Sequence, residues 1–169
     1  MAALSASGSL VYATGSTERL LVRVDAGGAA RPLDRLPAGE YATPRYAPDG
    51  TRVALTVTSA AGTEVRVLDL ASGVLTPLVA DGDRASPAWS PDGKRVVFAW
   101  TRGAARDLWW QAADGSDSAQ LLVSDGSRIG SGVLSPDGRT VLYGSAPGPA
   151  SRGRRGIPTG CVASGSRRR

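Results

Sequence analysis

Short apolar runs separated by turn-forming residues follow one another along most of the chain. Three of these runs, Val53–Val57, Val96–Trp100 and Val141–Tyr143, each begin three residues after a glycine. A fourth run, Leu10–Ala13, begins 43 residues before the first of them. The runs are short, rich in β-branched and aromatic residues and bounded by turns. This pattern predicts β-strands rather than helices.

The turns between the runs recur at a fixed spacing. The tripeptide Pro-Asp-Gly occurs three times, at steps of 43 and 45 residues, and a second marker (Asp25, Asp69, Asp114) recurs at steps of 44 and 45. Proline sets φ at the first central position of a tight turn, aspartate tolerates the next position, and glycine takes the left-handed one. The sequence therefore predicts a repeat in which each unit contains a tight hairpin. The predicted turn residues are Pro48, Asp49, Gly50, Pro91, Asp92, Gly93, Pro136, Asp137 and Gly138.

The predicted strands are apolar on both faces. Along a strand, successive side chains point to opposite sides, so Val96 and Phe98 face one way while Val97 and Ala99 face the other. A sheet with one face in water would alternate apolar and polar residues instead. Burial on both sides is expected when each small sheet lies between sheets of its own kind.

Each repeat has room for four strands. In the best-defined unit these are expected at residues 87–90, 95–100, 107–112 and 120–123. Four strands in about 40–45 residues is the size of one β-propeller blade. A solenoid repeat is usually shorter, and an immunoglobulin-like sandwich does not repeat its turn sequence in phase. The predicted fold class is all-β, a partial β-propeller of about three and a half four-stranded antiparallel blades in an open ring.

The repeat also sets the predicted domain boundaries. The first unit is expected to lack its opening strand, and the last to end after two strands. Because the open ends would leave strand edges and apolar blade faces uncovered, we expect a larger propeller or self-association through the open blade edges. The expected segments are a lead-in (1–7), the propeller repeats (8–145, divided into a partial blade 8–36, blades 41–80 and 84–124, and a partial blade 129–145) and a tail (146–169).

The basic charge of the chain belongs to its tail. The net charge is +5, but residues 151–169 contain six arginines and no acidic residue, which leaves 14 basic and 15 acidic residues elsewhere. A nucleic-acid-binding face would need basic residues spread over the folded surface, so we expect no nucleic-acid partner. The Gly/Ser/Arg-rich tail shows no strand pattern and is predicted to be disordered.

The composition argues against catalysis and cofactor binding. The chain has no histidine and no asparagine, and its one cysteine, Cys161, lies in the tail. This removes Ser-His-Asp and Cys-His catalysis, the usual zinc sets and a kinase catalytic loop. The glycines of Gly130–Gly132 are placed inside a predicted strand, so a phosphate loop is not expected there. We expect no enzyme activity, no cofactor and no metal in this chain. No signal peptide or membrane span is recognised, and the compartment stays open.

The repeat unit resembles a known family at Trp89–Phe98, which contains an aromatic residue, Ser-Pro-Asp-Gly, basic residues and an apolar strand. This segment is similar to the WD-repeat-like bacterial propeller repeat of the TolB type, and the resemblance covers about residues 8–145. The unit at Tyr46 has alanine in place of serine, and the unit at Leu134 has leucine in place of the aromatic residue. Tyr46 and Trp89 stand beside the turns on the expected innermost strands, so they are candidate contacts at a channel mouth. Trp109 and Trp110 are expected to pack on opposite neighbouring blades.

The first unit carries a narrower resemblance. Gly8, Leu10–Tyr12, Leu21–Asp25, Gly28 and Pro32-Leu33 resemble the start of the C-terminal propeller of bacterial serine/threonine protein kinases. This resemblance implies a protein- or ligand-binding sensor module within a larger signalling protein. The alternatives are the substrate-gating propeller of a prolyl-oligopeptidase-like serine peptidase and a TolB-like envelope adaptor.

Overall fold

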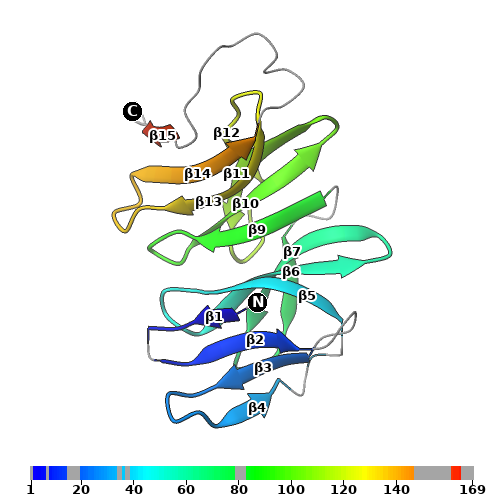
Figure 1. Cartoon of the computed structure of the whole chain (residues 1–169), viewed down its shortest axis with the longest axis vertical. Coiled ribbons are helices and arrows are strands. Elements are labelled where there is room, and N and C mark those ends of the chain that lie inside the picture. The colour runs from blue at the N-terminus through cyan, green and yellow to red at the C-terminus, as the bar shows by residue number, and fades with distance from the viewer. Residues whose placement is uncertain are drawn as a thin grey trace.

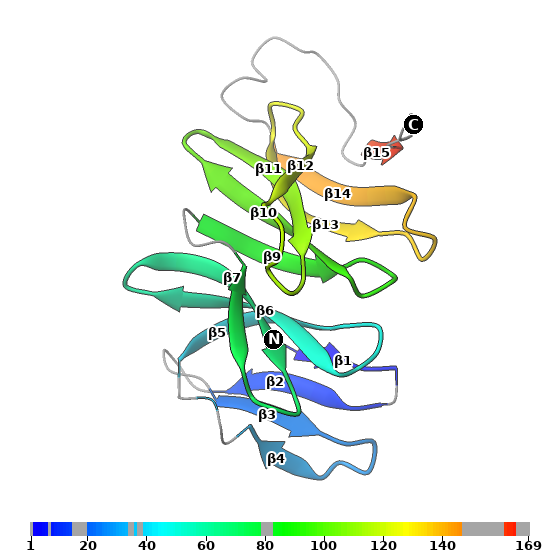
Figure 2. The same cartoon turned by 180° about the vertical axis from the view of Figure 1, so that it is seen from behind.

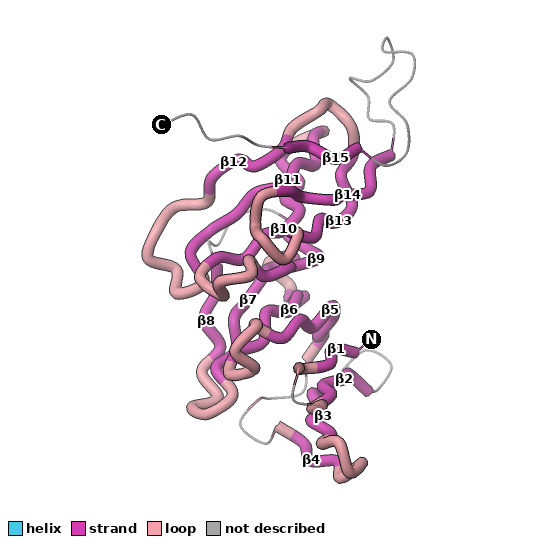
Figure 3. Tube along the Cα trace, turned by 90° about the vertical axis from the view of Figure 1, so that its left-hand side faces the viewer, coloured by secondary structure: helices cyan, strands magenta, loops and turns pink. Residues whose placement is uncertain are grey.

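The computed structural model confirms the predicted all-β class. Within the part of the chain that the structure describes, every regular element is a strand and no helix occurs (Figure 3). The strands form small antiparallel sheets that follow one another from β1 to β15 without closing into a ring (Figure 1). The described residues are 2–6, 8–14, 20–33, 36, 39–78, 83–146 and 161–164.

Blade 1 is a complete four-stranded sheet with the order β1-β2-β3-β4. Its strands are β1 (Ala2–Leu4), β2 (Leu10–Thr14), β3 (Leu20–Val24) and β4 (Ala30–Pro32).

The structure differs here from the expected boundary, because β1 lies in the segment expected to be a lead-in. The hairpin that joins β1 to β2 closes through a bond from Ser5 N to Ser9 O at 2.7 Å. Gly8 adopts the left-handed φ of +82° inside it. The opening strand of this unit is therefore present, although its turn contains neither proline nor aspartate.

Blade 2 has the same order, β5-β6-β7-β8. Its strands are β5 (Glu40–Tyr46), β6 (Arg52–Ser59), β7 (Gly62–Asp69) and β8 (Leu75–Leu78).

Blade 3 contains the four strands expected from the sequence. They are β9 (Asp83–Trp89), β10 (Arg95–Arg102), β11 (Ala105–Ala112) and β12 (Gln120–Val123). β12 has the expected bounds, whereas β9 begins four residues before the expected start and β10 and β11 extend toward each other through a tight hairpin.

Blade 4 contains β13 (Arg128–Leu134), β14 (Thr140–Ala146) and β15 (Cys161–Ser164). One parallel bridge, between Arg106 and Arg128, joins it to blade 3. β15 pairs antiparallel with the free edge of β14. It lies in the segment predicted to be a disordered tail, so these four residues differ from that prediction. The other tail residues after Ala146 lie outside the described part.

The blades pack face to face, and the strands of the central blades are buried on both sides. In β10, Val96, Phe98 and Trp100 pack toward blade 2, while Val97 and Ala99 pack toward blade 4, and all five are at most 5% exposed. This confirms the two-sided burial expected from the apolar pattern. The first strands of successive blades contact one another in turn, β1 with β5, β5 with β9 and β9 with β13. The view from behind shows the same succession of blades (Figure 2).

Candidate functional site

The three Pro-Asp-Gly turns form hairpins of one geometry. In each, the glycine N–H donates to the carbonyl of the residue that precedes the proline, at 2.9, 2.9 and 2.8 Å for Gly50, Gly93 and Gly138. These glycines have φ values of +70°, +67° and +68°, which favour a residue without a side chain. The geometry of this tight turn therefore explains why proline, aspartate and glycine recur at these positions.

The turns of neighbouring blades lie against one another and form a continuous row. A Cβ built on Gly93 would lie 3.6 Å from Cδ of Pro48, and one built on Gly138 would lie 3.7 Å from Cδ of Pro91. We call these three turns and the basic residue that follows the second and third the turn row. Its exposed charged side chains are those of Asp49, Asp92, Lys94, Asp137 and Arg139.

Hydrogen bonds inside the turns hold the aspartates ionised. Asp92 accepts a bond from the Ser90 hydroxyl at 2.6 Å and one from the Lys94 N–H at 3.0 Å. These bonds lower the pKa of Asp92, with the serine bond as the largest cause. Asp137 has the same arrangement with Ser135, and its pKa is lowered for the same reason.

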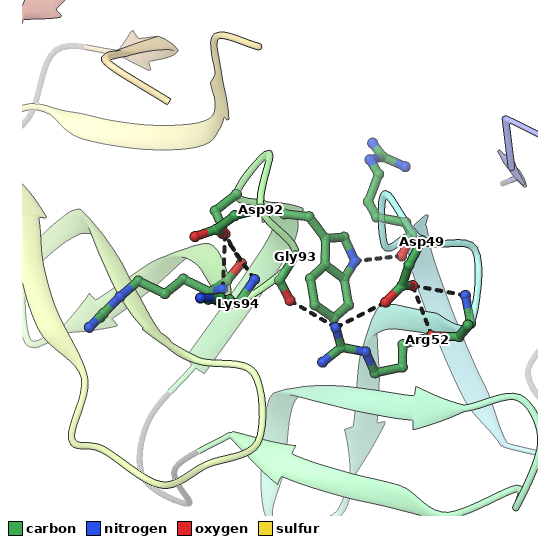
Figure 4. Close-up of polar contacts among 10 residues, drawn as sticks. Asp49, Arg52, Asp92, Gly93 and Lys94 are labelled. Carbon is green, nitrogen blue, oxygen red and sulfur yellow. Dashed lines mark hydrogen bonds and ion pairs between the residues drawn. The ribbon is translucent and has the colours of Figure 1, made fainter. Parts of the chain in front are cut away.

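Arg52 links the first two of these turns, as the close-up in Figure 4 shows. Its Nη2 donates to the Gly93 carbonyl at 2.9 Å and lies 3.3 Å from the Asp49 carboxylate. The guanidinium carbon lies 5.0 Å from the ring centroid of Trp89, within cation–π range. In the opposite direction, Trp89 Nε1 donates to the Arg45 carbonyl on blade 2 at 2.9 Å. Two hydrogen bonds therefore join blades 2 and 3 beside the turns, one donated by blade 2 and the other by blade 3.

The equivalent arginine of blade 3 has different contacts. Arg95 lies 3.2 Å from Asp117 and 4.8 Å from the ring centroid of Trp110, and both partners belong to its own blade. Threonine occupies this position in blade 4. The link made by Arg52 is therefore a feature of one blade interface, and the repeat period alone does not predict it.

A polar link joins blade 4 to the segment between β12 and β13, which connects it to blade 3. The Tyr143 hydroxyl donates to Asp125 at 3.0 Å, and Asp125 also accepts from the Ser127 N–H at 2.9 Å. Burial raises the pKa of Asp125, but the bonds from Ser127 and Tyr143 outweigh it, so the pKa is lowered.

The structure places the two candidate channel-mouth residues in blade interfaces. Trp89 is 9% exposed and packs between blades 2 and 3. Tyr46 is half-buried against the core between blades 1 and 2, and burial raises its pKa. Both rings thus have packing roles, and a ligand contact at either stays a prediction.

The adjacent tryptophans of β11 face opposite sides of blade 3, as expected. Trp109 packs on the core shared with blade 2, and Trp110 packs on the core shared with blade 4. Trp109 meets Trp100 edge to face, with ring centroids 5.0 Å apart. Both rings therefore act as core residues.

The inner strands carry bulges with strained backbone. Thr43 and Ser86 occupy equivalent positions, have φ values of +47° and +58°, and each precede a proline. The pairing register shifts at this point in β5, and β13 shifts at the equivalent point. Left-handed φ costs roughly 1–3 kcal/mol for such residues. The strain is offset by the surrounding strands, and at Thr43 by a 2.7 Å bond between its hydroxyl and that of Thr56.

An open pocket of about 280 Å³ lies between blades 1 and 2. Its charged lining residue, Asp69, accepts bonds from the N–H groups of Ala71 and Ser72, at 3.1 and 2.7 Å. The lining is Pro32, Leu33, Leu36, Leu68, Asp69, Leu70, Ala71 and Gly73.

Other candidate chemistry is not assembled in the described part of the chain. No three His, Cys, Asp or Glu side chains there come together as metal ligands. Gly130–Gly132 lies within β13 and is not a loop. Among these residues there is also no helix with the length and apolar character needed to cross a membrane.

Sequence reasoning missed two features of this region. The interblade role of Arg52 was not anticipated, because an arginine after a turn has no signal for its partner in the next blade. The fourth turn, at Ser5–Ser9, did leave a signal, because Gly8 precedes Gly50 by 42 residues and Ser5 stands three residues before it.

Comparison with known proteins agrees with this geometry. The family described as the TolB beta propeller domain matches residues 13–152. The chain belongs to this family. Among curated proteins, none matches the chain.

Solved structures show the same fold in this TolB-type chain. TolB from Acinetobacter baumannii is 23% identical, with a TM-score of 0.74 over 86% of this chain and 37% of that protein. A protein assigned as TolB in Agrobacterium tumefaciens is 22% identical, with a TM-score of 0.74 over 85% of this chain and 53% of its own length. A prolyl endopeptidase is 15% identical, with a TM-score of 0.66 over 98% of this chain and 29% of its own length. The chain thus spans about a third to a half of the two TolB structures.

Proposed function

We propose that this chain is a non-catalytic protein-binding segment of a TolB-type propeller, and that its partner binds the turn row. The observation that carries this proposal is the separation of apolar from charged side chains. The apolar repeat positions are buried between blades, while the turn row exposes charged side chains from three successive blades at one end. Loops held by a rigid scaffold are favoured places for binding.

The charge pattern of the turn row suits a polar peptide or protein surface. The aspartates are held ionised by bonds inside their turns, and Lys94 and Arg139 lie beside them on the second and third turns. Mixed charges in a fixed row give specificity and orientation more than affinity.

Selection of a displayed random-peptide library against the purified chain tests this proposal. Lys94→Glu changes the turn row, and Ala104→Glu places the same charge at the exposed tip of the β10–β11 hairpin, at the other end of blade 3. We expect selected peptides to bind the Lys94→Glu variant at least about tenfold more weakly, a loss of about 1.4 kcal/mol, and the Ala104→Glu variant with unchanged affinity. Equal binding to both variants would contradict a site on the turn row.

For the longer protein, we propose the bacterial serine/threonine kinase type of signalling protein. The residues of the first unit that resemble a kinase-attached propeller support this proposal. The likeness to a prolyl endopeptidase is a likeness of fold, and it keeps a gating propeller as the alternative, together with a TolB-like envelope adaptor.

The coding sequence on either side of this chain distinguishes the kinase type, the peptidase and the envelope adaptor. A kinase catalytic loop encoded upstream supports the kinase type. A Gly-x-Ser-x-Gly elbow encoded downstream supports the peptidase, and an upstream signal peptide without either supports the adaptor.

A further inference from the structure

Arg102, the last residue of β10, differs from two other arginines that stack on tryptophan. Arg52 lies beside Asp49, and Arg95 lies beside Asp117. Arg102 is exposed, and among the described residues no acidic side chain lies within ion-pair distance of it. Its guanidinium therefore presents a planar fork of N–H donors that no carboxylate of the described residues occupies.

Two tryptophan rings hold this guanidinium in place. Its central carbon lies 4.7 Å from the ring centroid of Trp100 and 5.4 Å from that of Trp109. Trp100 is only 5% exposed, and both rings pack in the core between blades 2 and 3. Because the rings are fixed, Arg102 has less side-chain freedom to lose when it binds than a free surface arginine.

An exposed apolar side chain extends this surface. Leu121 is 52% exposed and is the cross-strand neighbour of the half-buried Trp109, so the two lie on the same face of blade 3. We call Arg102, Trp109 and Leu121 the arginine patch. Arginine and tryptophan are the residue types that most often dominate binding energy in protein interfaces. Both blades of this interface belong to the described array, so the exposure of Arg102 does not arise at an end of the array.

We propose that the arginine patch binds an acidic peptide segment of a partner protein. A carboxylate of the partner accepts from the fork of Arg102, and a neighbouring apolar side chain covers Trp109 and Leu121. The fork of arginine matches a carboxylate with two parallel hydrogen bonds. Asp83 and Asp107 lie at the same end of blade 3, so a polyanion such as a membrane surface would meet repulsion that a single carboxylate can avoid.

The proposal does not rest on the turn row, because Arg102 lies at the opposite end of β10. It is tested with a displayed random-peptide library that is first depleted on the Arg102→Gln variant and then selected on the wild-type chain. The depletion also removes peptides that bind the turn row, since this variant keeps that row. We expect the remaining peptides to carry aspartate or glutamate next to leucine, isoleucine or phenylalanine. They should bind Arg102→Gln at least about tenfold more weakly than wild type.

Resynthesised peptides identify the contact. Replacing the acidic residue of the peptide by its amide should weaken binding to wild type but not to Arg102→Gln, because both changes remove the same contact. Leu121→Ser should also weaken binding. Arg31→Gln is the matched control, because it removes the same charge from an exposed arginine on β4, and it should bind like wild type.

Two further variants separate the arginine patch from the turn row. Ala104→Glu places a negative charge two residues from Arg102 and should weaken these peptides, whereas Lys94→Glu should leave them unchanged. Circular dichroism and thermal melting verify that each variant folds.

Four results would overturn the proposal. One is a selection that yields no Arg102-dependent peptide. Another is a peptide that binds equally well without its carboxylate. Equal losses in Arg102→Gln and Arg31→Gln would indicate attraction by net charge alone. Phosphatidylglycerol vesicles that bind wild type but not Arg102→Gln would indicate a membrane surface in place of a peptide.

Discussion

The residue before the proline is serine in the Pro-Asp-Gly turns of blades 3 and 4 and alanine in that of blade 2. Ser90 Oγ donates to Asp92, and it accepts from the Arg95 N–H at 2.9 Å. In blade 2 the same position is Ala47, and Asp49 takes its bonds from Thr51 instead. The hydroxyl thus joins the two sides of the turn in blade 3, where the serine is buried.

Substituting Ser90 with alanine tests this role. We expect Ser90→Ala to lower the free energy of unfolding in urea by about 1–2 kcal/mol, because a buried hydrogen-bonding group loses its partner. The matched control is Ser118→Ala, at an exposed serine. It should change the free energy by less than about 0.5 kcal/mol. Similar losses in the two variants would contradict the role of the Ser90 hydroxyl.

The hydrogen bond between Ser90 and Asp92 also predicts how the free energy of unfolding changes with pH. The pKa of folded Asp92 lies below its ordinary value of 3.8, first because of the Ser90 bond. Asp92 therefore contributes stability that is fully present above pH 3.8 and is lost as the pH falls through the folded pKa. The stability gap between wild type and Ser90→Ala should shrink at acid pH. A gap that stays constant under acid would show that the ionised carboxylate does not contribute.

Trp89 and Trp109 allow a second comparison between similar side chains. Trp89 Nε1 donates across the blade interface to Arg45, whereas Trp109 Nε1 is buried with no hydrogen-bond partner. Phenylalanine keeps an aromatic ring but has no N–H. We expect Trp89→Phe to lower the free energy of unfolding by about 1–2 kcal/mol more than Trp109→Phe, because only the first leaves a carbonyl unpaired. Urea titrations of both variants measure the difference, and a larger loss for Trp109→Phe would contradict it.

The residue types at this end of the blades were predictable from the sequence, but their partners were not. Pro-Asp-Gly fixes a local turn, so its geometry can be derived from three adjacent residues. The bond from Trp89 to Arg45 joins residues 44 positions apart. It depends on the distance between two packed sheets, which no local pattern encodes.

At Gly132, β13 lies very close to the side chains of blade 3. A Cβ built on Gly132 would lie 2.6 Å from Cδ1 of Leu108, which is fully buried, and 3.3 Å from Cγ2 of Val141. The glycine therefore lets blades 3 and 4 pack closely. Gly144, on the adjacent β14, has open space at the same point.

This contrast gives a prediction for the strands. We expect Gly132→Ala to destabilise the chain by about 1–3 kcal/mol, because the added methyl group must displace packed side chains of blade 3. Gly144→Ala is the control and should be neutral or slightly stabilising, because it restricts the unfolded chain without a clash. Thermal unfolding of both variants checks this. Equal effects would mean that Leu108 can move aside at little cost.

The strand bounds also show what periodicity can and cannot predict. β12 matches its predicted range, and β10 contains its predicted range, because each holds a short apolar run with polar residues on both sides. β1 was missed because its turn lacks proline and aspartate. β15, which pairs with β14, was missed because Cys161–Ser164 lies after the last repeat, where no repeat marker predicts a strand.

At the scale of the whole molecule, the main contacts between blades of the described residues join neighbouring blades, so local stability should vary along the array. Among the described residues, β6 and β10 are covered on both faces by neighbouring blades, whereas β2 and β14 are each covered on one face.

Amide hydrogen exchange should therefore be slowest in blades 2 and 3 and faster in blades 1 and 4, because an end blade can open by separating from a single neighbour. Uniform protection across all four blades would show that the array unfolds as one unit.

The turn at Ser5–Ser9 has a consequence for how such chains are recognised. It keeps the Ser5 hydroxyl bonded to the Ser9 N–H at 2.9 Å and the left-handed Gly8, the two features that it shares with the turns at Ser90 and Ser135. The hairpin of blade 1 thus forms without proline or aspartate. Counting Pro-Asp-Gly signatures gives a lower bound on the number of blades. A search for serine and glycine three positions apart, in phase with the period, should recover repeats that the full signature overlooks.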